Sequence, residues 1–136
     1  MALKIGSNTK VIRTFTPTTI EELKNKIAQT KQDGKIWAYD LSLLEITEIE
    51  DWLFDGCTGL QSIDLPINLI KIGKGAFSGC TRLISVQIPK NVIKIGCGAF
   101  KGCKKLKDVT LPLGANAVLD CVFEDCDALK TIHVNR

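Results

Sequence analysis

A period of 23 residues runs through most of this chain and constrains its fold more than any other feature. Phenylalanine, cysteine and leucine each recur four times at that interval. The three columns are Phe54, Phe77, Phe100 and Phe123; Cys57, Cys80, Cys103 and Cys126; and Leu60, Leu83, Leu106 and Leu129. Because a unit of this size cannot bury its own apolar side chains, neighbouring units must stack on one another. The period therefore predicts a solenoid with the repeated side chains in its core.

Each unit contains one predicted strand that ends at a proline. Ile63 and Leu65 alternate with polar residues, as the side chains of a strand with one buried face do. Proline cannot donate to a backbone ladder, so Pro66, Pro89 and Pro112 mark the strand ends. Strands from successive units are expected to form a parallel sheet with small polar residues on its outer face. The outward residues predicted to bind a partner are Asp64, Gln87, Thr110 and His133.

Residues 1–34 differ from the repeats and are predicted to cap the N-terminal end of the solenoid. A β-prone stretch, Lys10–Phe15, precedes a helix that the Asp33-Gly34 pair ends. Two overlapping capping boxes suit the start of this helix, Thr18 with Glu21 and Thr19 with Glu22. Residues 35–41 form the first predicted strand. We therefore expect one domain, with about four repeats in residues 35–136.

The four cysteines of the repeat column are predicted to be buried, unreactive thiols. Parallel side chains in a column offer neither the tetrahedron that zinc requires nor good disulfide geometry. Cys97 and Cys121 lie outside the column, 24 residues apart on adjacent units. That spacing leaves a disulfide and two free thiols as alternatives. Six cysteines without obvious partners favour a reducing compartment.

The sequence offers no group of residues that predicts an enzyme. The glycine-rich stretch Gly73–Gly79 lacks the Gly-Lys-Ser/Thr ending of a phosphate-binding loop and recurs at Gly96–Gly102 as part of the repeat. The single histidine, His133, falls at an outward strand position with no adjacent acid. We expect no catalytic residue, no metal and no cofactor. A membrane is not an expected partner either, because no apolar run approaches the length of about 18 residues that a spanning helix needs.

Charge is arranged in bands along the chain. Residues 71–107 hold nine basic residues and no acid, whereas residues 40–64 and 108–127 hold acids and no base. One interpretation is attraction between neighbouring units, and another is a basic surface that steers an acidic protein partner. The lysines predicted to meet that partner are Lys71, Lys94, Lys101, Lys104 and Lys105. The phenylalanines belong to the core column, so nucleic acid is not an expected partner.

Two segments of the repeat resemble a known family. They are IGKGAFSGCTRLISVQIP (72–89) and IGCGAFKGCKKLKDVTLP (95–112), and they are similar to the BspA-type leucine-rich repeat. The resemblance extends over residues 36–136 and implies a leucine-rich-repeat solenoid that binds other proteins. Many members of this family are surface proteins of bacteria or protozoan parasites implicated in adhesion. The outer units depart from the pattern, with Glu50 and Leu119 in place of a turn glycine and Asn135 in place of proline, so we expect different turns there.

The C-terminal end of the solenoid is a candidate surface for self-association. The apolar residues expected to border it are Phe123, Leu129, Ile132 and Val134. An uncapped solenoid end exposes core side chains and a strand edge. The irregular stretch 113–123 shields this end, another copy or partner covers it, or the chain is part of a longer protein; the sequence leaves all three open.

These observations predict an α/β repeat solenoid, a short leucine-rich-repeat right-handed superhelix with a parallel sheet and an N-terminal strand–helix cap. The expected function is a non-enzymatic protein–protein interaction module that binds through its sheet face or its basic band. The alternatives are a self-associating structural unit, forming a homo-oligomer, and a fragment of a surface adhesin. The expected location is the cytoplasm if the N-terminus is native, and otherwise the cell surface or the exterior.

Overall fold

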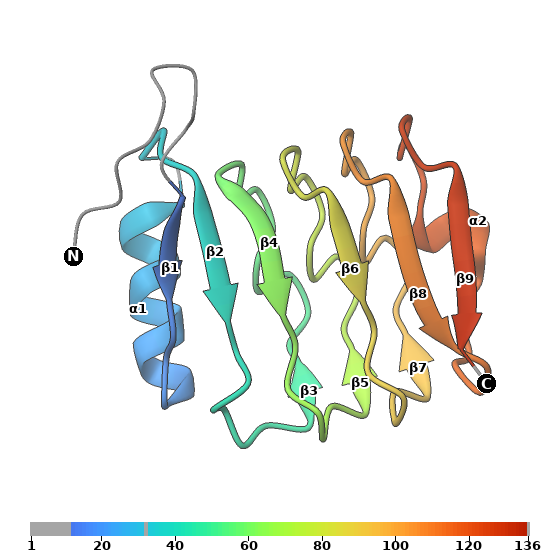
Figure 1. Cartoon of the computed structure of the whole chain (residues 1–136), viewed down its shortest axis with the longest axis horizontal. Helices are drawn as coiled ribbons and strands as arrows, with labels where there is room; N and C mark the ends of the chain where they lie inside the picture. The colour runs from blue at the N-terminus through green and yellow to red at the C-terminus, as the bar shows by residue number, and fades with distance from the viewer. Residues whose placement is uncertain (1–11, 32, 136) are drawn as a thin grey trace.

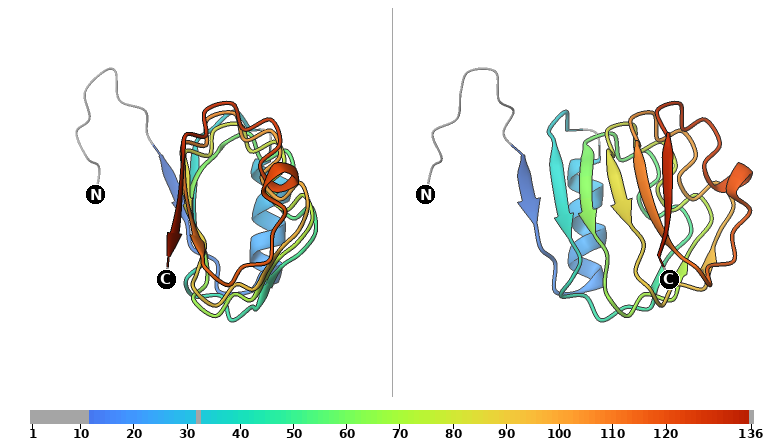
Figure 2. Two further views of the ribbon diagram at one scale, coloured as in Figure 1. Left: turned by 90° about the vertical axis from the view of Figure 1, so that its right-hand side faces the viewer. Right: turned by 45° about the vertical axis from the view of Figure 1, so that its right-hand side comes forward.

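The computed structural model describes residues 12–31 and 33–135, which wind into a flattened coil with strands along one long side (Figure 1, Figure 2). The helices are α1 (Ile20–Thr30) and α2 (Leu119–Val122). The strands are β1 (Arg13–Phe15), β2 (Trp37–Asp40), β3 (Glu48–Ile49), β4 (Leu60–Asp64), β5 (Lys71–Ile72), β6 (Ser85–Gln87), β7 (Lys94–Ile95), β8 (Asp108–Pro112) and β9 (Thr131–Asn135). In these two ranges, the helices are too short or too polar to cross a membrane.

Most of the longer strands lie side by side on one side of the coil, which we call the front face (Figure 1). They form two parallel ladders, β1-β2-β4 and β6-β8-β9. The predicted columns set the register, since Val86 pairs with Val109 and Val109 pairs with Ile132. In the strand before the first full unit, Tyr39 pairs with Ile63, after an irregularity that absorbs one extra residue. The parallel sheet and the solenoid predicted from the repeat are confirmed.

A second, shorter ladder runs behind the front strands. It consists of β3, β5 and β7, and it places Ile49, Ile72 and Ile95 in register. All three isoleucines are buried, which explains why this apolar column recurs beside the turn glycines. These short strands were not predicted from the sequence.

The core is built on a stack of aromatic rings that follows the phenylalanine column. Phe54 and Phe77 stack with ring centroids 5.0 Å apart, and Phe77 and Phe100 with centroids 5.1 Å apart. Phe123 continues the stack at 5.6 Å, and Tyr39 closes its other end with an edge contact at 5.8 Å. Offset stacks and edge contacts of this kind stabilise a core beyond the area that they bury.

The turn before each front strand requires a left-handed backbone. The glycines Gly56, Gly79 and Gly102 hold it, with φ of 73°, 73° and 72°. In the fourth unit Asp125 takes the same conformation at φ 60°. A second left-handed position lies four residues earlier in the unit. Trp52 occupies it in the first full unit at φ 63° and Gly75 occupies it in the next, and the Trp52 ring lies where a Cβ atom of Gly75 would be. A glycine is therefore required at 75 for space as well as for its backbone.

The fourth unit bends differently from the others, as its sequence predicted, but the different turn expected at Glu50 is wrong, because residues 48–56 follow the same course as 71–79 and 94–102. Leu119 stands in the place of a turn glycine and begins α2, whereas the equivalent stretches of the second and third units are turns. At the unit's end Asn135 remains in the ladder and pairs with Pro112. The departure from the repeat pattern thus changes the back of this unit and leaves its front strand in register.

The N-terminal strand and helix cover the first repeat. β1 pairs with β2, and α1 buries Leu23 and Ile27. Thr19 and Glu22 form the capping box, so this is the pair, of the two possible ones, that begins the helix. The helix ends at Thr30, whose hydroxyl lies 2.7 Å from the hydroxyl of Tyr39 in the core. Lys10 and Val11, part of the predicted strand, lie outside the described residues.

Candidate functional site

A groove of about 820 Å³ opens on the front face between β4 and β6. It lies where the front strands divide into their two ladders, because in the described ranges no strand pairing joins β4 to β6. The polar and charged residues that line this front groove are Ser62, Asp64, Ser85, Gln87, Lys90, Thr110 and Asn135. Ile67 and Pro89 add apolar surface to its lining.

The interrupted ladder leaves backbone groups without their usual partners at the groove. Across the β6–β8 pairing, Ile88 N–H donates to Thr110 O at 2.9 Å. One unit earlier, within the part of the chain that the structure describes, the equivalent bond from Leu65 N–H to Gln87 O is not made. Leu65 and Gln87 both line the groove. A ligand in the groove therefore meets a backbone donor and acceptor besides the polar side chains.

The structure brings together three of the four front residues selected from the sequence. Asp64, Gln87 and Thr110 line the groove, while His133 pairs with Thr110 along the ladder and is exposed beside it. A carboxylate, an amide and a hydroxyl provide hydrogen-bond donors and acceptors with short side chains. This chemistry is suited to holding a ligand by hydrogen bonds.

The five lysines selected from the sequence lie in two separate regions. Lys71 and Lys94 belong to the back ladder, on β5 and β7, whereas Lys101, Lys104 and Lys105 precede β8. Three of the five pair with an acid exactly one unit away: Lys71 with Glu48 at 3.5 Å, Lys101 with Glu124 at 3.3 Å and Lys104 with Asp127 at 3.2 Å. The basic run therefore contributes to attraction between neighbouring units, which was one of its two interpretations. These pairs are half-exposed, so each stabilises the fold by about 1 kcal/mol at most.

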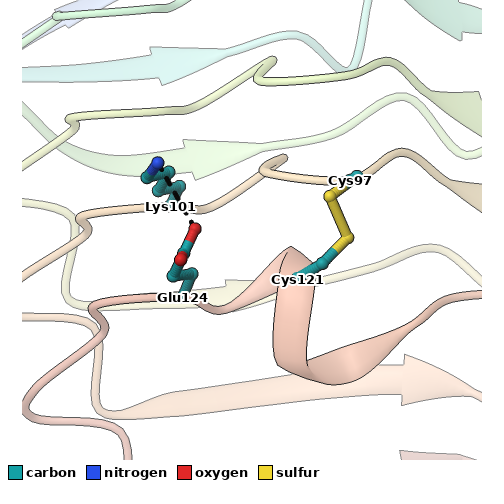
Figure 3. The surroundings of a disulfide bond; sticks show 4 residues. All are labelled: Cys97, Lys101, Cys121 and Glu124. Atoms are coloured by element: carbon teal, nitrogen blue, oxygen red, sulfur yellow. Dashed lines mark ion pairs between the residues drawn. A yellow bond between two sulfur atoms is a disulfide. The ribbon is translucent and has the colours of Figure 1, made fainter.

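A disulfide joins Cys97 to Cys121, whose Cα atoms lie 5.1 Å apart. Figure 3 shows that it links adjacent units, as the Lys101–Glu124 ion pair does. Of the two alternatives that the 24-residue spacing left open, the structure has the bonded one. Two of the six cysteines are thus paired, so six unpartnered thiols no longer argue for a reducing compartment.

The remaining cysteines follow the core column, and three of them, Cys80, Cys103 and Cys126, hydrogen-bond to the backbone of the preceding unit. The Cys80 thiol donates to Phe54 O and the Cys103 thiol to Phe77 O, both at 3.2 Å. Burial raises the pKa of Cys80 well above its usual value and that of Cys57 to about 11. At neutral pH these two thiols are therefore protonated and unreactive. The predicted burial is confirmed for Cys57, Cys80 and Cys103 but not for Cys126, which is only partly buried, and the thiol–carbonyl bonds were not predicted.

The apolar residues selected at the C-terminal end differ in their exposure. Phe123 is buried under the ring stack, and Leu129 is partly buried against the core. Ile132 and Val134, on β9, are 36% and 52% exposed. The end of the solenoid is thus partly covered by its own fourth unit, and β9 carries the exposed apolar side chains.

A second pocket, of about 250 Å³, lies on the back of the solenoid and was not predicted. Lys71, Lys74, Lys94 and Asn116 are part of its lining, and the disulfide borders it. Lys74 was counted in the basic run, but nothing in the sequence showed that its loop and the fourth unit meet. The one available signal was the 23-residue spacing of Lys71 and Lys94, which places them side by side.

Comparisons with known proteins agree with this architecture. A family model described as the BspA type leucine-rich repeat region matches residues 39–136, in six copies. Two crystal structures share the fold, and each is 23% identical to the chain. One is a leucine-rich cell surface protein of Faecalibacterium prausnitzii A2-165, with a TM-score of 0.62. The other is a leucine-rich repeat protein of Bacteroides ovatus ATCC 8483, with a TM-score of 0.51. The matches cover 73% and 75% of this chain but 32% and 30% of theirs, so the chain spans about a third of each. No curated protein sequence matches it.

Proposed function

The chain belongs to the BspA-type leucine-rich repeat family, and we propose that it is a non-enzymatic module that binds a protein partner in its front groove. The observation that carries this proposal is the interruption between β4 and β6, which exposes unpaired backbone groups beside short polar side chains. An extended peptide segment presents the same groups in return, alternating N–H and C=O along its length. The preferred ligand is therefore an extended stretch of a partner protein.

The side chains of the groove favour a polar segment with one apolar contact. Asp64 and Gln87 are exposed and offer acceptors to a donor-rich stretch, while Ile67, 67% exposed, offers an apolar surface at the rim. Large aromatic or arginine anchors are absent from the lining. Because such anchors dominate tight interfaces, we expect modest affinity from this groove alone.

The test uses a displayed library of random peptides selected on the wild-type protein. Gln87→Arg places a long cation in the groove, and Gln29→Arg makes the same change on the exposed face of α1. Selected peptides should lose binding to Gln87→Arg and keep binding to Gln29→Arg, with both variants melting as the wild type does. Peptides that bind all three proteins equally would refute the groove as the binding site.

Lysines outside the groove are proposed to speed the approach of an acidic partner. Lys105 has no ion pair in the described part of the chain, whereas Lys101 and Lys104 have theirs with the fourth unit. Lys105→Glu should therefore slow association with an acidic peptide at low salt and have little effect at high salt. The same slowing at both salt concentrations would contradict this electrostatic role.

Self-association through β9 is a second candidate, favoured by the exposure of Ile132 and Val134. Edge strands pair readily with other strands when nothing blocks them. Light scattering over a dilution series measures it: a dimer that survives high salt and disappears in Val134→Asp supports assembly, and a monomer at all concentrations refutes it. The structurally similar protein of Faecalibacterium is a cell surface protein, which supports the surface location that we propose for this chain as well.

A further inference from the structure

The pocket on the back of the solenoid, which we call the back pocket, is formed where three units meet. β5 and β7 supply Lys71 and Lys94, the loop after β5 supplies Lys74, and the fourth unit supplies Asn116. The pocket holds about 250 Å³, which is below the usual size of a site for a whole drug-sized ligand. Its dimensions therefore suit a small chemical group.

Lysine side chains lie next to one another in this pocket, and not every lysine has an acid beside it. Lys71 and Lys94 are direct register partners on neighbouring strands, about 5 Å apart at this spacing. Like charges directly opposite each other destabilise a sheet. Glu48 offsets Lys71 through an ion pair, but Lys74 and Lys94 have no carboxylate partner among the described residues.

The one acid in the lining is already hydrogen-bonded elsewhere. Asp51 accepts the backbone N–H of Lys74 at 2.8 Å, so its carboxylate holds the loop. Across the pocket Asn116 lies beside Lys94, because the two residues form an isolated parallel bridge. The lining thus combines three lysines with one carboxylate and a neutral amide, so positive charge is in excess, which lowers the energy of an anion placed beside the lysines.

The wall of the pocket is fixed by covalent and backbone bonds. Ile95 N–H donates to Asn116 O at 3.1 Å, and Gly98 N–H donates to Cys121 O at 2.9 Å. The Cys97–Cys121 disulfide then ties the same two units together (Figure 3). Because the wall is already ordered before a ligand arrives, binding costs less conformational free energy than it does at a flexible site.

From this geometry we propose that the back pocket binds a compact oxyanion, a sulfate or phosphate group, between Lys71, Lys74 and Lys94. Lysine suits this role because its ammonium is a compact charge with three donors that rotate toward an oxygen. Among the residues that the structure describes, no ion pair holds Lys74 or Lys94, and Lys71 shares its charge with Glu48. The site is separate from the front groove, so either can fail without the other.

The experiment titrates sodium sulfate and sodium phosphate into the isotope-labelled protein by NMR, at ionic strength held constant with sodium chloride. The expected result is a saturable shift of the backbone amides of Gly96 and Asn116. Lys94→Gln should raise the dissociation constant about fivefold, the effect of losing one nearby charge in water. The matched control is Lys105→Gln, an unpaired lysine outside the pocket, which should change it less than about twofold.

Two results would overturn the proposal. One is a response that grows linearly with anion concentration and extends to every lysine-bearing loop, which indicates general ion effects. The other is an equal loss of affinity in Lys94→Gln and Lys105→Gln. Both variants carry a neutral residue at an exposed position, so melting curves that match the wild type exclude misfolding as the cause.

Esters then distinguish the carrier of the group. Methyl phosphate and a 6-sulfated monosaccharide present the same oxyanion on a small organic stem. Saturable binding of either ester supports the proposal and identifies whether phosphate or sulfate is carried. Rejection of both esters by a pocket that accepts the free anions would overturn its role as a site for a group on a larger ligand.

Discussion

The ring stack makes a quantitative prediction about the core. The side chain of Phe77 is fully buried and lies between Phe54 at 5.0 Å and Phe100 at 5.1 Å, with all three rings nearly parallel. Phe77→Ala removes a ring with contacts on both sides and leaves a cavity in the middle of the solenoid. Phe123→Ala is the matched control, because its ring stacks on one side only, at 5.6 Å, and is 9% exposed.

The expected losses follow from these contacts. Truncating a buried phenylalanine costs about 3–5 kcal/mol of unfolding free energy, and each aromatic pair adds about 0.5–1.5 kcal/mol. Phe77→Ala should therefore lie near the top of that range, at about 5 kcal/mol. Phe123→Ala loses one aromatic pair instead of two, and water can enter the space that the ring leaves at the end of the solenoid. Its expected loss of unfolding free energy is therefore about 3 kcal/mol.

Urea denaturation followed by far-UV circular dichroism measures both losses. A domain of this size has a total stability of about 5–15 kcal/mol, so Phe77→Ala itself can fail to fold. Phe77→Leu keeps most of the volume and supplies a folded comparison; its loss should exceed that of Phe123→Leu. Equal losses at the two positions would refute the argument that two-sided stacking holds the units together.

Three further predictions concern the turns, the disulfide and the buried thiols. Asp125→Gly should raise the unfolding free energy by about 0.5 kcal/mol, because glycine adopts a left-handed φ without strain. Gly102→Ala should lower the unfolding free energy by about 1 kcal/mol for the same reason. Urea midpoints of the two variants that shift in the same direction would contradict this. Replacing Cys97 and Cys121 by serine together should cost about 3 kcal/mol, from the loss of a 24-residue cross-link, and the wild type with dithiothreitol should match the double variant in urea. Because burial raises the pKa of Cys57 to about 11, its alkylation by iodoacetamide at pH 8 should be slow in the native protein and fast in urea; rapid native labelling, read by peptide mass spectrometry, would contradict its burial.

The core of the fold could be predicted from the sequence because its signal is periodic. Every 23 residues the same apolar type returns, and burial makes such columns mandatory in each unit. The strand register followed from the same columns, with Val86, Val109 and Ile132 aligned as expected. The helix cap at Thr19 was equally local, since the side chains that satisfy the first turn lie within three residues of one another.

The groove and the back pocket could not be located in the same way. The outward residues Asp64, Gln87 and Thr110 were selected correctly as one face, but their column gives no sign that the ladder stops between β4 and β6. Exposed polar side chains fit a continuous ladder as well as an interrupted one. The disulfide was similarly undetermined, because Cys97 and Cys121 are each one position away from the other's column.

The charge bands connect these features through the period itself. Residues 23 apart are neighbours on adjacent units, so an acidic run beside a basic run automatically produces pairs such as Lys101 with Glu124. Within the basic run the same rule places lysine beside lysine, as at Lys71 and Lys94. Among the described residues, the ion pairs between repeat units therefore lie at the boundaries of the bands, and uncompensated positive charge collects inside the basic one. A spacing that stabilises the stack at its band edges is thus also the reason that an anion is attracted to the back pocket.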